Sequence, residues 1–362
     1  MLNIQVEDAN IEGMSPLISP KDLKSQVKRT AAAERAVIQG RMDIRATLQG
    51  ENPRLLVVVG PCSIHDTGAA MEYARKLQQL SLELSERLCI VIRTYFEKPR
   101  TIDGWTGLIA DPYLDGTGAM NTGLQWARQL LLTINELCLP TATEFLDPLV
   151  PQFISDLVAW AAIGARTTES QTHRQMASGF SMPVGFKNST DGNVEIAVQA
   201  MQSARGSHTF IGVNEHGQNS IARTKGNQFG HLVLRGGKEN PNYDETNIAS
   251  ALRKLEEAGL PQMLMVDCSH ANSRKDADKQ IEVCREVVRQ RAAGNSGIMG
   301  IMLESNLFSG SQKIPDDPGQ LSQLQYGVSV TDACIGWEQT EELLREIYEK
   351  LPCCARREAI AV

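Results

Sequence analysis

The stretch LLVVVGPC at residues 55–62 is apolar nearly to its end, where a glycine and a proline precede a cysteine. A short run this rich in β-branched residues predicts a strand buried on both faces, as in a parallel sheet. Similar runs recur along the chain, separated by longer helical patterns. The eight predicted strands are 55–62, 89–95, 141–146, 163–167, 184–188, 209–213, 263–268 and 298–304. Eight strands alternating with helices predict a single α/β domain, a (β/α)8 TIM barrel.

Two parts of the chain do not fit a minimal barrel. Residues 1–50 precede the first predicted strand and form a polar, partly helical N-terminal extension. A glycine-rich stretch at about 214–236 is typical of an inserted β-hairpin rather than of a crossover helix. We therefore predict a catalytic barrel at 51–362, with an extension and a hairpin that serve regulation or assembly.

The composition limits the class of partner. The chain carries 36 Lys and Arg against 43 Asp and Glu, and its net charge of -7 argues against nucleic acid and anionic membranes. Apolar runs stay shorter than the roughly 18 residues of a membrane span, and the start of the chain lacks an export signal. The eight cysteines show no paired spacing, so we expect reduced thiols in a cytoplasmic protein.

Charged and metal-binding side chains stand where the predicted strands end. In a (β/α)8 barrel these strand ends meet at one rim, and active sites lie there. Any one of these residues could be a solvated strand end or part of an ion pair, but so many at one rim predict a site. They are Cys62, Arg93, Glu144, Arg166, Lys187, Asp267, His270 and Glu304.

Basic residues near this rim indicate the class of ligand. Arginine presents a planar fork that suits phosphate and carboxylate groups, and an acidic protein must hold an anion with local cations. We therefore expect small phosphorylated, carboxylated molecules as ligands. The cations concerned are Arg93, Lys98, Arg100, Arg166, Lys187 and Arg235.

Four residues could hold a metal ion at the same rim. Cys62, His270, Glu304 and Asp332 supply a thiolate, an imidazole and two carboxylates. Such a mixed set suits one borderline divalent ion, Mn, Fe, Co or Zn, better than Mg or Ca. No local ligand motif joins the four, so their spacing leaves open that each is an ordinary structural residue.

Eight segments carry a resemblance to a known family. In order along residues 50–350, they closely resemble the short, microbial-type class (class I) of DAHP synthases, which make 3-deoxy-D-arabino-heptulosonate 7-phosphate. The segments are GPCSIHD (60–66), RTYFEKPRT (93–101), GARTTESQTHRQMASG (164–179), PVGFKN (183–188), HLVLRGGK (231–238), VDCSHAN (266–272), MLESN (302–306) and YGVSVTDACIGWE (326–338).

The resemblance implies a role for each matched residue. It implies catalytic roles for Lys98, Cys62 and His270, and metal ligation by Cys62, His270, Glu304 and Asp332. The implied phosphoenolpyruvate contacts are Arg93, Lys98, Glu144, Arg166, Lys187 and Arg235. The implied erythrose 4-phosphate contacts are Pro99, Arg100, Thr101 and Asp267.

The resemblance also implies the reaction, the first step of the shikimate pathway to aromatic amino acids. C3 of phosphoenolpyruvate attacks the sugar aldehyde, water adds at C2, and phosphate leaves. We expect Lys98 to protonate the nascent alkoxide, because crowding by neighbouring arginines should lower its pKa toward neutrality. The loop after Lys98 departs from the family at Asp103 and Thr106, which puts sugar-phosphate affinity in question.

Feedback inhibition and assembly follow from the same resemblance. The extension and the hairpin resemble parts of an effector pocket and a subunit interface, which implies a homodimer or a homotetramer. Gly212, with the NEHGQ segment after it, most resembles the tyrosine-inhibited subtype, because the phenylalanine-inhibited one carries Ser there and a missing side chain leaves room for a larger ring. The pocket residues could instead simply pack. They are Asp8, Gln152, Phe180, Ser181, Phe210, Gly212 and Ala222.

Two other functions share some of these features. A sister synthase that uses arabinose 5-phosphate shares the barrel and the phosphoenolpyruvate chemistry. An inactive barrel could also act as an amino-acid sensor. The KPRT turn at 98–101 and the long extension favour the four-carbon sugar, and the complete set of site residues favours an enzyme.

Overall fold

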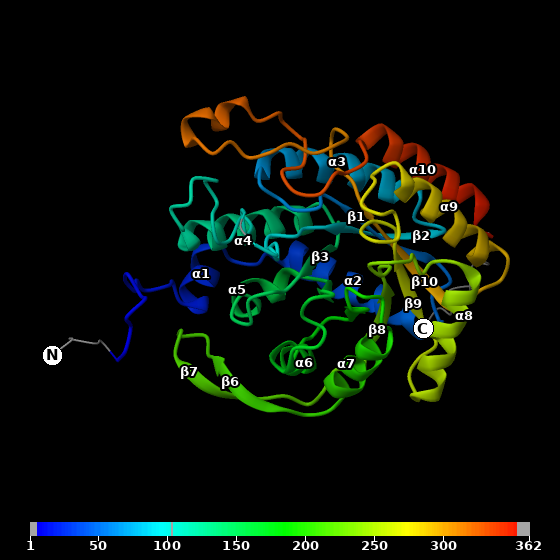
Figure 1. The fold of residues 1–362 in the computed structure, drawn as a ribbon, viewed down its shortest axis with the longest axis horizontal. Helices are drawn as coiled ribbons and strands as arrows, with labels where there is room; N and C mark the ends of the chain where they lie inside the picture. Colours follow the sequence, from blue (N-terminus) through cyan, green and yellow to red (C-terminus); the bar gives the residue numbers. More distant parts are fainter. Residues whose placement is uncertain (1–5, 103, 353–362) are drawn as a thin grey trace.

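The computed structural model describes residues 6–102 and 104–352, and its centre is a closed barrel of eight parallel strands (Figure 1). Around the barrel the strand order is β1-β10-β9-β8-β5-β4-β3-β2. The (β/α)8 prediction is confirmed. The strands are β1 Leu55–Gly60, β2 Leu88–Arg93, β3 Thr141–Glu144, β4 Trp160–Ile163, β5 Val184–Lys187, β8 Gly230–Leu234, β9 Leu264–Asp267 and β10 Ile298–Glu304.

The prediction that residues 209–213 form the sixth barrel strand was wrong. Residues 209–213 do form a strand, β6 Thr209–Val213, but it pairs antiparallel with β7 Asn219–Arg223 outside the barrel. The sixth barrel strand is β8, whose residues are all buried, whereas β6 alternates exposed and half-buried residues. Alternation suits a sheet with one solvated face, and a continuously buried run suits a parallel barrel. The inserted hairpin therefore lies at 209–223 rather than at 214–236.

The fourth predicted strand was displaced along the chain. It runs over β4 instead of 163–167, because the chain turns directly after Ile163. The backbone N–H groups of Thr167 and Thr168 both bond to Gly164 O, at 3.0 and 2.9 Å, and this turn ends the strand.

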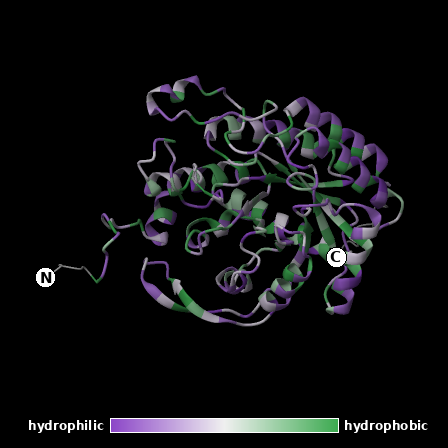
Figure 2. Ribbon diagram, in the orientation of Figure 1, coloured by the Kyte–Doolittle hydropathy of each residue, from purple (hydrophilic) through white to green (hydrophobic). Residues whose placement is uncertain are grey.

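Helices surround the barrel and close its amino end. Ile44 and Leu48 of α2 pack with Leu56 and Trp160 in the barrel interior, and α2 contacts β1, β2 and β4. Figure 2 shows hydrophobic strands inside and hydrophilic outer faces on the last two helices. The helices are α1 Pro20–Gln26, α2 Ala31–Leu48, α3 Thr67–Glu83, α4 Met120–Glu136, α5 Pro151–Ile154, α6 Gln171–Ser178, α7 Glu195–Arg205, α8 Glu245–Glu257, α9 Lys279–Ala292 and α10 Trp337–Lys350.

The N-terminal extension reaches the hairpin. Lys21 N donates to Glu215 O at 2.8 Å, so the start of α1 lies against the β6–β7 turn (Figure 1). The division of the chain into a regulatory extension and a catalytic barrel stays a prediction. Among the described residues no helix is long and apolar enough to span a membrane, and the six described cysteines are unpaired.

Candidate active site

The carboxyl ends of the barrel strands surround a cavity of about 430 Å³. Most of the residues predicted from the sequence line it together. They are Arg93, Lys98, Pro99, Arg100, Thr101, Glu144, Arg166, Lys187, Arg235, His270 and Asp332. The corrected sixth strand completes the rim, because Arg235 directly follows β8.

A buried ion pair forms the floor beneath this cavity. Arg93 Nη2 lies 2.8 Å from Glu304 Oε1, and the two side chains are only 1% and 2% exposed. The guanidinium also donates to the carbonyls of Pro61 and Cys62, at 3.0 and 3.2 Å, and stacks 3.5 Å from the ring centre of Tyr95. Burial alone would raise the pKa of Glu304, but its neighbours His270 and Arg93 lower it. Arg93 is thus held rigidly at the base of the cavity.

Cys62, Glu304 and Asp332 form a cluster of possible metal ligands. One ligand atom from each residue lies within 4.8 Å of the others, and the described residues contain no other such cluster of His, Cys, Asp and Glu. His270 is not part of this cluster, although its Nε2 lies 3.7 Å from Glu304 Oε1, and its role as the fourth ligand stays a prediction. Burial and the Glu304 charge raise the pKa of the Cys62 thiol, so its thiolate form is costly here unless a cation lies beside it. A soft sulfur, an imidazole and two carboxylates fit a borderline divalent ion.

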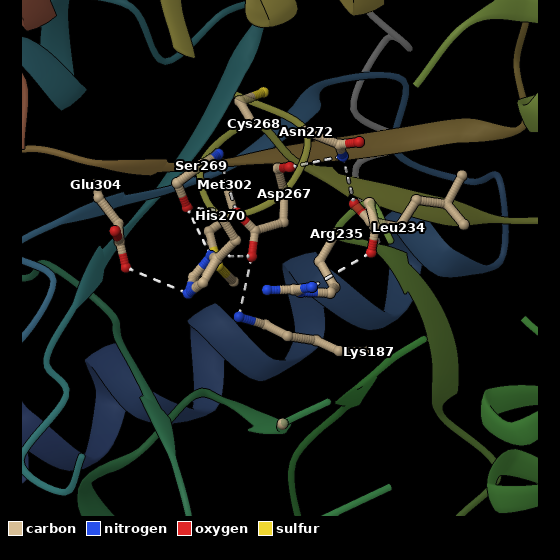
Figure 3. Close-up of polar contacts among 12 residues, drawn as sticks. Lys187, Leu234, Arg235, Asp267, Cys268, Ser269, His270, Asn272, Met302 and Glu304 are labelled. Carbon is tan, nitrogen blue, oxygen red and sulfur yellow. Dashed lines mark hydrogen bonds and ion pairs between the residues drawn. The ribbon is translucent and has the colours of Figure 1, made fainter. Parts of the chain in front are cut away.

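A second carboxylate orients His270 (Figure 3). His270 Nδ1 lies 2.9 Å from Asp267 Oδ2, and Lys187 Nζ lies 2.9 Å from the same oxygen. Nδ1 also lies 2.9 Å from Ser269 Oγ, which itself bonds to Asp267 Oδ1. Because Asp267 and Ser269 engage Nδ1, the other ring nitrogen, Nε2, faces Glu304, as in metal sites where an outer carboxylate fixes the imidazole. Burial would raise the pKa of Asp267, but His270 and Lys187 lower it well below its usual range.

Asp267 lies deeper than the sequence suggested. Its side chain is 0% exposed and it does not line the cavity, whereas we expected it to contact erythrose 4-phosphate. The direct contact stays a prediction. In the structure the Asp267 carboxylate connects His270 and Lys187.

The prediction of a lowered Lys98 pKa was wrong for this arrangement of side chains. Lys98 Nζ lies 2.8 Å from Cys62 Sγ and 3.1 Å from Asp332 Oδ2. Burial would lower the pKa of Lys98, but the negative charges of Cys62, Glu304 and Asp332 outweigh it and raise the pKa well above its ordinary value. Lys98 is close to Arg100 in the sequence, but its side chain points toward Cys62 and Asp332 instead.

Arg166 joins the two expected substrate subsites. Its Nη1 donates to Pro99 O at 2.9 Å and its Nη2 to Thr101 Oγ1 at 3.1 Å, so it bridges to the 98–101 turn. The departure at Thr106 leaves this turn intact, because Thr106 contributes its carbonyl, which accepts from Lys98 N at 2.9 Å. Asp103, the other departure, lies outside the described residues.

Sequence reasoning missed several residues that line the cavity: Tyr95, Glu97, Ile102, Gly164, Ala165, Thr190 and Lys275. Burial raises the pKa of Glu97 to about 8, although the N–H groups of Asp147 and Leu146 bond to its carboxyl group. Lys275 Nζ lies 3.3 Å from Asp332 Oδ1. Glu97 stands inside a quoted motif and was recoverable, whereas Lys275 reaches the site through a turn that local spacing does not reveal.

The expected effector residues are divided among several elements. Phe210 and Ala222 are cross-strand partners on the β6–β7 hairpin, and a Cβ at Gly212 would lie 3.3 Å from that of Ala222. The Phe180 ring lies 5.1 Å from that of Phe145, between centroids. Ser181 O accepts from Arg45, Gln152 lies in α5, and Asp8 lies in the leader with a φ of 56°. Their common role in a pocket stays a prediction.

Comparisons with known proteins agree with the geometry. The family model described as "DAHP synthetase I family" matches residues 26–345. A Tyr-sensitive phospho-2-dehydro-3-deoxyheptonate aldolase of Salmonella typhimurium is 50% identical over 349 residues, covering 96% of each chain. A Trp-sensitive one of Escherichia coli is 51% identical over 343 residues, covering 95% of this chain and 96% of the relative. The structure of the aldolase from Francisella tularensis SCHU S4 superimposes with a TM-score of 0.91 at 43% identity, covering 94% of this chain and 98% of that one.

Proposed function

Because the chain belongs to the DAHP synthetase I family, we propose that its barrel rim condenses phosphoenolpyruvate with erythrose 4-phosphate and water, giving DAHP and phosphate. The chain is a 3-deoxy-7-phosphoheptulonate synthase, an enzyme of the first step toward the aromatic amino acids. One observation carries the assignment of the site. Basic residues for two anionic substrates line a single cavity, and its floor is a cluster of anionic metal-binding groups.

Phosphoenolpyruvate is held by the cations at the barrel wall. Its carboxylate and phosphate need several fixed donors, which Arg93, Arg166, Lys187 and Arg235 supply from four different strands or strand ends. Glu144, at the end of β3, stands beside them and gives the site an acceptor. Fixed cations at this position also stabilise the charge that develops as the enol carbon attacks.

Erythrose 4-phosphate binds at the 98–101 turn. Arg100 and Thr101 contact its phosphate, and Pro99 lines the path toward the floor. The contacts of Arg166 with Pro99 and Thr101 support this arrangement, because one arginine then spans both subsites and holds the two substrates in register.

A divalent ion held by Cys62, His270, Glu304 and Asp332 would supply Lewis-acid chemistry that polarises the aldehyde. The donor set suits Mn, Fe, Co or Zn. Asp267 keeps His270 in the orientation that offers Nε2. Lys98 points its ammonium group at the same cluster and is our candidate for protonating the alkoxide formed from the aldehyde.

Two variants test the proposed role of Lys98 as the general acid. Lys98→Met removes the proton and the charge, whereas Lys98→Arg keeps only the charge. Both should lower kcat strongly if the proton is needed. Near-normal turnover of Lys98→Met at saturating substrates would transfer the acid role to another group.

The hairpin is the proposed place of regulation and assembly. Ile211 and Ile221 face one another across β6 and β7 and are 86% and 69% exposed, an apolar surface that a second copy of the chain would cover in a homodimer or homotetramer. Tyrosine is the favoured effector because Gly212 leaves space beside Phe210. The Tyr-sensitive and Trp-sensitive relatives are equally similar to this chain, so the preference rests on Gly212.

The decisive experiment is a turnover assay on metal-free protein with individual metals. Phosphate release and DAHP, identified by mass spectrometry, should appear with erythrose 4-phosphate after a single divalent ion is added. Titration with tyrosine, phenylalanine and tryptophan then tests the effector. Preference for arabinose 5-phosphate would identify the eight-carbon synthase instead, and tyrosine binding without phosphate release would identify a sensor.

A further inference from the structure

The chain that follows β8 is held by asparagine side chains instead of by neighbouring strands. Asn188 Oδ1 accepts from Arg235 N at 2.8 Å, and Asn188 Nδ2 donates to Gly236 O at 3.0 Å. Asn242 Oδ1 accepts from Gly236 N at 2.8 Å. Asn272 Nδ2 donates to Leu234 O at 3.1 Å. Leu234 O, Arg235 N and both backbone groups of Gly236 thus end on three side chains, while Arg235 O between them accepts from Ala271 N at 3.2 Å.

These three asparagines also bond to one another, and we call them the asparagine clamp. Asn242 Nδ2 donates to Asn188 Oδ1 at 3.2 Å, and Asn242 N donates to Asn272 Oδ1 at 2.9 Å. They follow β5, β8 and β9 respectively, and their exposed fractions are 0%, 7% and 3%. Buried amides with this many satisfied bonds specify one backbone arrangement, because any shift leaves polar groups unpaired in the interior.

The packing around Gly236 shows how closely the clamp fits. Gly236 has a φ of +78°, and a Cβ at this position would lie 2.6 Å from Asn272 N. Only glycine adopts this conformation without strain and leaves room for the neighbouring loop. The direction in which the chain leaves β8 is therefore fixed both by the asparagine clamp and by the close packing around Gly236.

Arg235 is the residue whose direction depends on this arrangement. Within residues 6–102 and 104–352 its guanidinium has one hydrogen bond, from Nη1 to Gly236 O, and this bond is long at 3.4 Å. Figure 3 shows the Arg235 guanidinium and the Lys187 ammonium on the same side of Asp267. Building on the proposed function, we infer that Asn188, Asn242 and Asn272 are positioning residues that aim Arg235 at phosphoenolpyruvate.

The clamp also links the anion subsite to the metal-ligand side of the cavity. Asn272 Nδ2 donates to Asp267 O at 2.9 Å, and the Asp267 carboxylate contacts both His270 and Lys187 (Figure 3). Asn188 directly follows Lys187 at the end of β5. The backbones that carry two phosphoenolpyruvate cations and the expected ligand His270 are therefore fixed by one network.

Asn242→Ala and Asn227→Ala form a matched pair for testing this inference. Asn227 is equally buried, 6% exposed, but lies at the other end of β8, where Nδ2 donates to Met182 O at 3.0 Å and Oδ1 accepts from Phe229 N at 3.0 Å. Both variants should lower the melting temperature. Only Asn242→Ala should weaken phosphoenolpyruvate binding, because only this lost amide lies at the carboxyl end of β8.

The measurement is the Kd for phosphoenolpyruvate on Mn-loaded protein by calorimetry, with KM for each substrate. We expect Asn242→Ala to raise this Kd about tenfold, because small displacements of a binding group have large effects, and to leave the KM for erythrose 4-phosphate within about twofold. In an Arg235→Met background the same change should have little further effect on Kd, as expected of a residue that acts through Arg235. If Asn242→Ala does not fold, Asn242→Asp keeps the acceptor for Gly236 N and should still raise the Kd, by about threefold.

The outcomes separate this inference from the proposed function. Equal Kd values for the folded Asn242 and Asn227 variants, or an undiminished effect of Asn242→Ala in the Arg235→Met background, would overturn the clamp alone. Wild-type protein that binds phosphoenolpyruvate but forms no DAHP would overturn the proposed function, while a selective loss in Asn242→Ala would still support the clamp.

Discussion

The barrel rim and the β6–β7 hairpin use polar and apolar residues in opposite ways. At the rim, charged groups are buried: Arg93 is 1% exposed, Glu304 2% and Asp267 0%. On the hairpin, apolar groups are exposed: Ile211 is 86% exposed and Ile221 69%. Buried charges are costly unless they are paired, and an exposed apolar face favours contact with another surface.

The difference shows what each region requires to be complete. The rim residues satisfy one another through close ion pairs, so the geometry of the rim is already present in a single chain. The two strands of the hairpin pair with each other, the hairpin has a backbone contact to the N-terminal extension, and its exposed apolar face is where we propose that a second copy of the chain packs. Changes at the rim should therefore affect chemistry and stability, and changes on the hairpin should affect assembly and inhibition.

Metal removal should have the largest effect. A chelator should reduce turnover by at least about a hundredfold, the scale of losing one electrostatic stabiliser, and one added divalent ion should restore it. Cys62→Ser should weaken metal binding at least about tenfold, measured by metal titration. Cys138→Ser, at an exposed cysteine before β3, is the control and should bind metal normally. Unchanged metal affinity in Cys62→Ser would refute the ligand assignment.

Breaking the buried ion pair should be next in size. Arg93→Met leaves Glu304 buried without its partner and should lower the free energy of unfolding by about 3–5 kcal/mol, measured in urea. The exposed pair of Glu215 and His216 on the hairpin, 3.4 Å apart, offers the contrast. Glu215→Gln should change the same free energy by less than about 0.5 kcal/mol. Similar losses in the two variants would contradict the difference drawn between the regions.

A side chain at position 212 should alter inhibition without altering catalysis. Gly212→Ser places an atom 3.3 Å from Ala222 Cβ, which narrows the space beside Phe210. Tyrosine inhibition should weaken about tenfold, the scale of one misfitting group in a pocket, while uninhibited kcat stays the same. Gly206→Ser, just before β6, is the control and should keep normal inhibition. Inhibition of the parent by phenylalanine or tryptophan alone would remove the preference for tyrosine.

We expect the smallest effect on the stability of a single chain from a charged residue placed on the exposed apolar face of the hairpin. Ile211→Asp should change the free energy of unfolding of the monomer by less than about 0.5 kcal/mol, yet shift the assembly toward smaller species in analytical ultracentrifugation. Ile38→Asp, on α2 and 50% exposed, carries the same charge elsewhere and should keep the parent assembly. An unchanged assembly in Ile211→Asp would place the subunit contact away from this face.

Most of the fold could be predicted from local pattern. Runs such as 55–60 and 298–304 are apolar until their ends, so burial on both faces follows from their own residues. Besides the displaced fourth strand, the exception was the choice between 209–213 and 230–234 for the sixth barrel strand. Both can form strands, and only non-local pairing with β5 and β9 decides which of them enters the barrel.

The site was predictable as a set of residues but not as a set of contacts. Strand ends of a parallel barrel meet at one rim, so Arg93, Lys187 and Glu304 had to lie near one another. Which partner each one takes depends on depth and side-chain direction. Lys98 stands next to Arg100 in the sequence, yet its ammonium group contacts Cys62 and Asp332 instead.

By itself, the sequence determined the barrel, the rim residues and the family resemblance, because these depend on which residues occur and in what order. The tertiary structure alone decided that Asp267 is buried behind His270, that Lys98 has a raised pKa, and that three distant asparagines meet around Gly236. The physical reason is distance. Burial, ion pairing and hydrogen bonding act over a few ångströms, and only the closed barrel brings residues this far apart in the chain within that range.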